Sequence, residues 1–66
     1  MKIGAKIREC IQGKGLTQNE VSKALNVTQA TVSQWISDKR QPDYDMLILL
    51  CKILDTTPNE LLGWED

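Results

Sequence analysis

The sequence of 66 residues has no histidine, only two cysteines and only three aromatic residues. Without histidine and without a C-x-x-C pair, Cys10 and Cys51 do not form a zinc site, and two cysteines are too few for a disulfide framework. Both fall on apolar helical stripes, so we expect free thiols that serve as small core residues. We therefore expect no metal and no cofactor.

Long apolar runs are also missing. No stretch approaches the roughly 18 apolar residues of a membrane span, and the N-terminal residues lack the apolar segment of a signal peptide. A chain of this length buries only about 60% of its unfolded surface, which leaves no room for a large internal cavity. These features predict one domain over residues 1–66 that is soluble and cytoplasmic, with no membrane contact and no small-molecule ligand.

The charge balance argues at first against a nucleic-acid partner. Eight basic residues stand against nine acidic ones, whereas nucleic-acid binders usually carry a basic surface. The distribution reverses that impression: residues 1–40 carry seven Lys and Arg against three Asp and Glu (+4), and residues 41–66 carry one against six (−5). A folded domain would then have one basic side, where a polyanion would bind.

Helical periodicity recurs along the chain and strand-like alternation is absent, so we expect an all-α fold of five helices. The first is predicted from about Ile3 to Gly13 and the fourth after the capping residue Asp43. A second capping box with Pro58 at the first helical position opens the last short helix, which runs to Gly63. The residues expected to point inward from the first and fourth helices are Ile3, Ile7, Cys10, Ile11, Leu47, Leu50, Cys51 and Leu54.

Two short helices joined by a tight turn are predicted in the middle of the chain. Thr17 and Glu20 form a capping box at the start of the second helix. Asn26 follows it and tolerates the left-handed conformation of a sharp helix exit. Thr28 then caps a third helix that runs to about Ser37. This compactness is typical of a helix-turn-helix unit.

The third helix has an apolar side and a polar side without any charge. At about 100° per residue, Val32, Trp35 and Ile36 share the apolar side. The other side holds Gln29, Ala30, Ser33, Gln34 and Ser37. Amides, hydroxyls and a methyl are the groups that read base edges in the major groove, since a Gln amide pairs with adenine and an Ala methyl packs on a thymine methyl. Ser and Gln are also common on solvated surfaces, so this face alone does not decide its function.

Residues 16–42, LTQNEVSKALNVTQATVSQWISDKRQP, closely resemble the helix-turn-helix of the phage repressor and Cro family, and the likeness extends over nearly the whole chain. The resemblance implies a compact five-helix bundle of the phage repressor DNA-binding type, with the helix-turn-helix formed by its second and third helices. It further implies a sequence-specific transcriptional regulator of double-stranded DNA, a repressor that reads the major groove with residues 28–37 as a dimer on a two-fold operator.

The resemblance also implies roles for single residues. It assigns base reading to the set that the helical wheel gives independently, namely Gln29, Ala30, Ser33 and Gln34. Gln18 stands where the family binds a backbone phosphate, at a helix N-terminus that favours an anion. Five more residues are placed for phosphate oxygens: Thr17, Thr28, Ser37, Lys39 and Arg40. Thr28 is needed as a cap in any case and the two cations could simply be solvated, while Trp35 is expected in the core.

Two positions depart from the family pattern. Ile36 and Ile11 stand where the family often has a Glu and a paired Arg, so we expect a hydrocarbon contact between them in place of an ion pair. Such a replacement can be neutral or stabilising. Asp38 stands where the family commonly has Gly, and Asp is among the residues that tolerate a positive φ.

Operator affinity requires two such units about one helical turn apart, which predicts a homodimer, at least on DNA. Apolar residues outside the inward stripe form a candidate interface: Ile48, Leu49, Ile53, Leu61, Leu62 and Trp64. Two alternatives are an antitoxin-type regulator that binds DNA and a partner protein, and a helical adaptor that does not bind DNA. Catalysis is disfavoured, because neither thiol has a histidine partner and the chain has no glycine-rich phosphate loop.

Overall fold

The computed structural model describes residues 2–63, and this range contains five α-helices and no strand. The helices are α1 (Gly4–Gly13), α2 (Gln18–Leu25), α3 (Gln29–Ile36), α4 (Tyr44–Leu54) and α5 (Pro58–Leu61). The predicted all-α architecture is thus confirmed, with each helix beginning within about one residue of its predicted start. No helix in the described range is long and apolar enough to cross a membrane.

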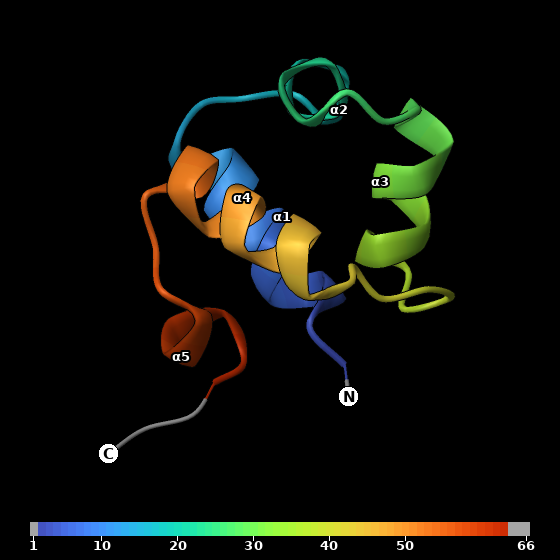
Figure 1. The fold of residues 1–66 in the computed structure, drawn as a ribbon. Helices are drawn as coiled ribbons and strands as arrows, with labels where there is room; N and C mark the ends of the chain where they lie inside the picture. Colours follow the sequence, from blue (N-terminus) through green and yellow to red (C-terminus); the bar gives the residue numbers. More distant parts are fainter. Residues whose placement is uncertain (1, 64–66) are drawn as a thin grey trace.

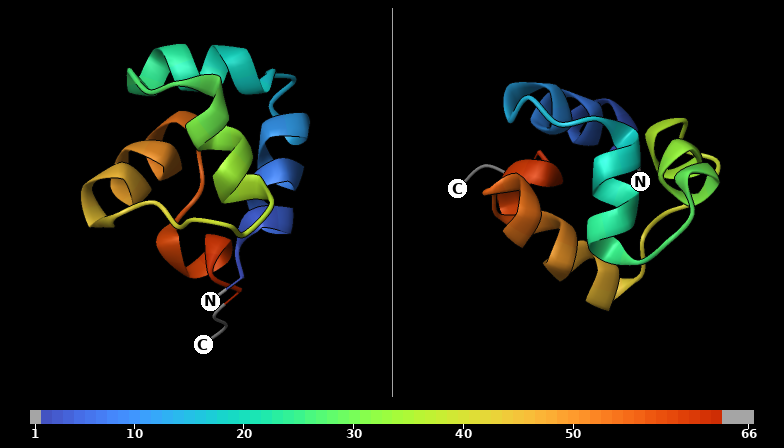
Figure 2. Two further views of the ribbon diagram at one scale, coloured as in Figure 1. Left: turned by 90° about the vertical axis from the view of Figure 1, so that its right-hand side faces the viewer. Right: turned by 90° about the horizontal axis from the view of Figure 1, so that it is seen from above.

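In Figure 1, α2 lies at one end of the molecule, α5 at the other and α3 along one side, and the left view of Figure 2 shows α1 and α4 on either side of α3. One core holds them together, and every helix contributes to it. Its members are Ile3, Ile7, Ile11, Val21, Leu25, Val32, Trp35, Leu50, Cys51, Leu54 and Leu61. Cys10 and Leu47, which were predicted to point inward, are only half-buried at the edge of this core.

The helices α2 and α5 begin at the residues that the sequence predicts, because side chains there form hydrogen bonds with backbone amides of the first turn. The Glu20 amide donates to the Thr17 hydroxyl (3.1 Å) and the Thr17 amide donates to the Glu20 carboxylate (3.0 Å), so the first capping box is complete. The second box forms in part: the Glu60 amide donates to the Thr57 hydroxyl (3.2 Å). The Thr57 hydroxyl in turn donates to the Glu60 carboxylate at 3.5 Å. In a complete capping box this carboxylate would accept the Thr57 amide instead.

The end of α3 is tied to the start of α1. Asp38 has a φ of 61°, as expected of a residue in place of glycine, and its carboxylate accepts the Gly4 amide at 2.9 Å. Gly4 is buried, and a Cβ atom there would collide with the backbone carbonyl of Ile36. The carboxylate also lies at the positive end of α1, where a negative charge is favourable. This junction holds α3 at a set position relative to α1.

Candidate nucleic-acid interface

The connection between α2 and α3 is three residues long and is held by backbone bonds. Asn26 adopts the left-handed conformation (φ 59°, ψ 42°), as predicted, and its amide donates to the Lys23 carbonyl at 3.2 Å. The Val27 amide donates to the Ser22 carbonyl at 2.9 Å. Thr28 then caps α3 by accepting the Thr31 amide at 3.2 Å. The two helices therefore meet through a sharp turn whose first two amides are bonded to the last turn of α2.

This turn directs one side of α3 into the core and the other outward. Val32 and Trp35 are buried, with exposed fractions of 0% and 4%, which confirms the core position predicted for Trp35. Gln29, Ala30 and Ser33 are exposed, and Gln34 is half-buried. The face predicted to read bases is thus at the surface, and α3 carries no charged residue. Contact of these side chains with bases stays a prediction.

Three of the predicted phosphate-binding residues also have structural hydrogen bonds. The Thr17 hydroxyl accepts an amide in its capping box, which leaves its own O–H available to donate to a phosphate. The Thr28 hydroxyl caps α3 and lies 2.9 Å from the Thr31 hydroxyl. The Ser37 hydroxyl donates to the Gln34 carbonyl at 3.3 Å. Thr17 therefore keeps a free donor, whereas Ser37 must give up an internal bond to contact a phosphate.

Lys39 and Arg40 lie directly beyond the exposed face of α3. Their amides donate to the Gln34 carbonyl, at 3.0 Å and 3.2 Å, so the chain folds back against the last turn of the helix. Both side chains are exposed, and neither forms an ion pair with any residue of 2–63. Their charges are available to an anion beside the polar face.

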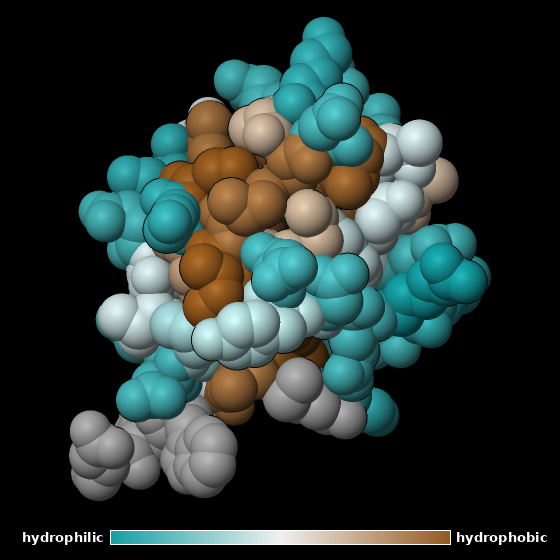
Figure 3. Space-filling model, in the orientation of Figure 1, coloured by the Kyte–Doolittle hydropathy of each residue, from teal (hydrophilic) through white to brown (hydrophobic). Residues whose placement is uncertain are grey.

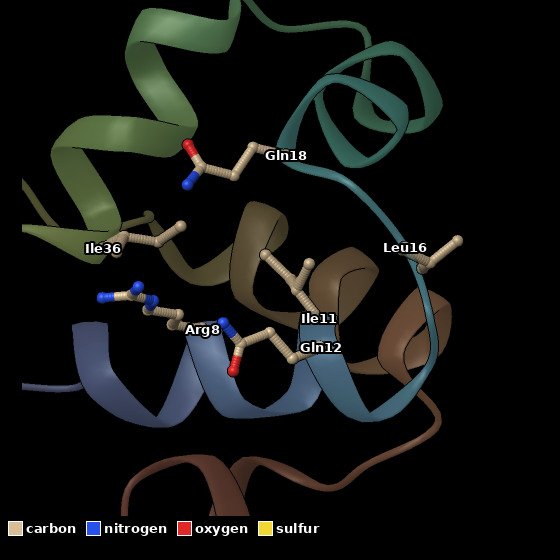
Figure 4. Close-up of a pocket in the computed structure, with 6 residues that line it drawn as sticks. All are labelled: Arg8, Ile11, Gln12, Leu16, Gln18 and Ile36. Atoms are coloured by element: carbon tan, nitrogen blue, oxygen red, sulfur yellow. The ribbon is translucent and has the colours of Figure 1, made fainter.

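A cavity of about 200 Å³ lies on the border of α1, α2 and α3 (Figure 4). Its lining is half polar and half aliphatic: Arg8, Gln12, Gln18, Ile11, Leu16 and Ile36. Gln18, predicted to bind a phosphate, is half-buried there. Arg8 and Gln12 were missed by the sequence reasoning, although their i, i+4 spacing beside Ile11 placed both on one flank of the first helix.

Ile11 and Ile36 line this same cavity, so their side chains do not occupy separate environments. Ile11 is buried at 3% exposure, and Ile36 is half-buried and packs against the core. The direct contact predicted between the two side chains remains a prediction. Two aliphatic side chains, Ile11 and Ile36, therefore line the cavity at the place where the family often has an ion pair.

An apolar surface covers α4 on the face shown in Figure 3. Leu49 is 42% exposed, and Ile48, Ile53 and Leu62 are half-buried, so these four residues of the predicted interface reach the surface. Leu61 does not. It is 1% exposed, because it is the residue through which the one-turn α5 packs into the core, and it is removed from the interface. Trp64 lies outside the described residues.

The chain belongs to the helix-turn-helix family, whose sequence model matches residues 7–61. This match contains all of α2, the turn and α3. The helix-turn-helix predicted from the sequence is thereby confirmed. The family is one of binding domains that carry a helix pair of this kind, which favours a binding function over catalysis.

Two curated relatives give the comparison more detail. The chain is 32% identical to the HTH-type transcriptional regulator ImmR of Bacillus subtilis over 66 residues, which are 100% of this chain and 52% of the relative. It is equally identical to the HTH-type transcriptional activator BcrR of Enterococcus faecalis, of which it covers 32%. The chain thus spans about half of one relative and a third of the other.

Among solved structures, the fold is similar to that of the P22 c2 repressor protein, crystallised with a synthetic operator. The TM-score is 0.88 at 26% sequence identity, and the match covers 98% of each chain. The five-helix bundle of the phage repressor type is therefore the fold of this protein.

Proposed function

We propose that this chain is a sequence-specific DNA-binding transcriptional regulator in which residues 1–66 act as one DNA-binding domain and α3 enters the major groove of double-stranded DNA. One observation carries the proposal: a braced helix exposes an uncharged face of amides, a hydroxyl and a methyl. A solvated helix of ordinary kind would carry charges there. Gln29, Ala30, Ser33 and Gln34 read bases in this proposal.

The proposal is supported by the relatives, which are named as transcriptional regulators, and by the P22 repressor, whose structure contains its operator. We favour a repressor over an activator, because a protein that occupies an operator can block transcription through its DNA-binding surface alone. Function on DNA implies a cytoplasmic location. The phosphate contacts that complete the interface come from Thr17, Gln18, Thr28, Ser37, Lys39 and Arg40.

The regulator binds as a homodimer, at least on DNA. One α3 contacts only a few base pairs, so two copies about one helical turn apart are needed for operator specificity. The apolar surface of α4 with Leu62 supports this part of the proposal, since its aliphatic side chains are exposed, as at Leu49, or only half-buried by residues 2–63. The acidic residues at the ends of α4 and in α5, namely Asp43, Asp45, Asp55 and Glu60, would then face away from the DNA.

Selection of bound sequences from random duplex DNA, followed by footprinting, tests the proposal. We expect a two-fold site of two short half-sites. Gln29→Ala and Gln34→Ala should each change the preferred bases, because each removes an amide that pairs with a base edge. The matched control is Lys39→Gln, which should weaken all sequences alike and lower the salt slope by about 0.9 for each bound protomer.

Two outcomes count against the proposal at different levels. A preferred sequence left unchanged by Gln29→Ala would contradict the assignment of base-reading residues. Selection that enriches no sequence would contradict the function itself and leave the protein-binding adaptor as the better interpretation.

A further inference from the structure

We infer that Asp38 is a positioning residue for DNA recognition: its carboxylate holds the last turn of α3 on the first turn of α1 and thereby sets which base Gln34 contacts. This role rests on the proposed function and deepens it, because it assigns part of the base specificity to a residue that acts through another. The sequence alone indicates only that Asp38 tolerates a positive φ.

The helix α3 is held at its two ends by different bonds. At its start, the Val27 amide donates to the Ser22 carbonyl at 2.9 Å and joins the turn to α2. At its end, the Asp38 carboxylate accepts the Gly4 amide at 2.9 Å and joins α3 to α1, which lies beside it in the left view of Figure 2. A helix fixed at both ends keeps its exposed face in one orientation.

The backbone at Asp38 completes the end of α3. Its amide donates to the Trp35 carbonyl at 3.2 Å, and the Lys39 amide donates to the Gln34 carbonyl at 3.0 Å. This arrangement satisfies the last carbonyls of a helix and requires a left-handed residue, for which glycine costs least. Glycine would therefore serve this backbone equally well, and what aspartate adds is the carboxylate.

The carboxylate supplies the cap that α1 lacks. Ile3 is the N-cap residue of α1 and forms no capping bond through its side chain. The Gly4 amide is one of the first-turn donors that have no partner within their own helix, so it needs an acceptor from elsewhere. Asp38 provides this acceptor from 34 residues away. It forms no ion pair within residues 2–63, and the positive end of the α1 dipole favours its charge.

The other packing between α1 and α3 has no such direction. Ile11 and Ile36 are aliphatic and line one cavity, and the missing side chain of Gly4 leaves room for the Ile36 carbonyl. Apolar burial is non-directional, whereas a hydrogen bond weakens steeply away from its preferred distance and angle. The bond from Gly4 to Asp38 therefore sets the angle at which α3 leaves the surface of α1.

Loss of this bond should affect the two ends of the exposed face unequally. Gln29 is the first residue of α3, next to the turn that still holds it, whereas Gln34 lies in the last turn. The five residues between these positions correspond to about 7.5 Å along the helix axis. A rotation of α3 about its start therefore moves Gln34 further than Gln29. Because hydrogen bonds to base edges require close geometry, the contact of Gln34 is the one that should be lost.

A comparison of Asp38→Gly with Asp38→Asn tests the inference. Both variants remove the same charge and tolerate a positive φ, but only asparagine keeps an acceptor oxygen. Bound sequences are selected from random duplex DNA at a temperature at which both proteins are fully folded. We expect Asp38→Gly to lose the base preference that Gln34→Ala alters and to keep the one that Gln29→Ala alters. Asp38→Asn should retain both preferences.

Affinities for the selected operator give the size of the effect. Asp38→Gly should bind about fivefold less tightly than Asp38→Asn for each bound protomer, because the two differ by one hydrogen bond. Their salt slopes should be equal, since their charges are equal. Cys51→Ala is the control for lost stability, because it removes a buried thiol from the core and leaves the bond to Gly4 in place. It should retain both base preferences.

Two results of the selection count against the inference or against the function beneath it. If Asp38→Gly retains the preference that Gln34→Ala alters, or loses both preferences equally, the inference is overturned and the proposed function stands. If the wild-type protein selects no sequence, the proposed function fails and the inference fails with it.

Hydrogen exchange measured by NMR tests the bond itself. The Gly4 amide should exchange slowly in the wild-type and Asp38→Asn proteins and faster in Asp38→Gly. The Glu20 amide, which donates to Thr17 at 3.1 Å in α2, is the internal reference and should exchange alike in all three. A Gly4 amide that exchanges equally in the three proteins would show that the carboxylate does not hold α1 to α3, and the inference would be wrong.

Discussion

Gly4 is the residue on which the close packing of α1 against α3 depends. A Cβ atom at this position would strike the Ile36 carbonyl and approach the Trp35 carbonyl oxygen to 2.8 Å. Both are backbone atoms, so the neighbour cannot turn aside as a flexible side chain does. Gly13, at the other end of the same helix, has nothing within 4 Å of such an atom. The packing of α1 against α3 therefore requires glycine at position 4, whereas no neighbouring atom requires it at position 13.

Alanine at these two positions should have opposite effects. We expect Gly4→Ala to lower the free energy of unfolding by about 1–3 kcal/mol, the usual cost of overpacking. Gly13→Ala should raise it by about 0.4–1 kcal/mol, because it restricts only the unfolded chain. Urea denaturation measures both. A Gly4→Ala protein as stable as Gly13→Ala would show that α1 does not approach α3 so closely.

Cys10 and Cys51 differ in environment, although both are free thiols as predicted. Cys51 is buried at 4% exposure, whereas Cys10 is half-buried. Burial raises the pKa of the Cys51 thiol above its ordinary value, and the nearby Cys10 raises it further. The neutral thiol of Cys51 is therefore a core group and not a reactive one.

The raised pKa of Cys51 predicts a loss of stability at alkaline pH. The unfolded chain releases this proton near pH 8.5, whereas the folded protein retains it to higher pH. The resulting stabilisation is complete below the unfolded pKa and is lost as the pH rises through the folded pKa. The free energy of unfolding should thus fall above about pH 8.5. Cys51→Ala, although less stable at neutral pH, should show a smaller fall over the same interval; equal slopes would contradict the assignment.

At the scale of the elements, short-range signals specify where the helices begin and end. Thr17, Thr28, Asp43 and Thr57 each cap the helix that follows, through a bond to the amide three residues on. Such bonds involve neighbours in the chain, so the residue types alone predict them. The contact between Asp38 and Gly4 is different, since 34 residues separate its partners. Only the positive φ of Asp38 was predictable, and its partner was not.

Substitutions at Asp38 should separate its two roles. Asp38→Asn keeps an acceptor oxygen and tolerates a positive φ, so we expect a change in unfolding free energy of less than about 1 kcal/mol. Asp38→Gly keeps the backbone conformation but loses the bond to Gly4, at a cost of about 1 kcal/mol. Asp38→Ala loses both and should be the least stable, by about 1–2 kcal/mol more. Thermal or urea unfolding gives this order, and equal stability of the Gly and Ala variants would contradict it.

At the scale of the whole molecule, the charges and the apolar surface lie on different elements. The unpaired cations that flank the exposed face of α3 come from α1 and from the segment after α3. The apolar surface is on α4, which also has acidic residues at its first turn and just beyond its end. A dimer joined through α4 would present two α3 helices on one side, with the acidic residues away from the DNA.

A charge placed in the apolar surface should disrupt this dimer without unfolding the monomer. Leu49 is 42% exposed, so Leu49→Lys leaves the core intact. We expect the binding curve on a two-half-site operator to lose its cooperativity, with the affinity for a single half-site unchanged. Leu49→Met, which retains the apolar area, is the control. Sedimentation measures the oligomeric state, and cooperative binding by Leu49→Lys would exclude Leu49 from the interface.

The amino-acid sequence alone determined the helices, their caps, the left-handed turn at Asn26 and the outward face of α3. These features depend on the periodicity of side chains and on bonds between residues three or four apart, which are local properties of the chain. Tertiary structure decided the burial of Leu61, the bond between Asp38 and Gly4, and the gathering of Arg8, Gln12 and Gln18 around one cavity. These depend on how helices pack against one another, and that packing juxtaposes residues whose separation in the chain carries no signal of their contact.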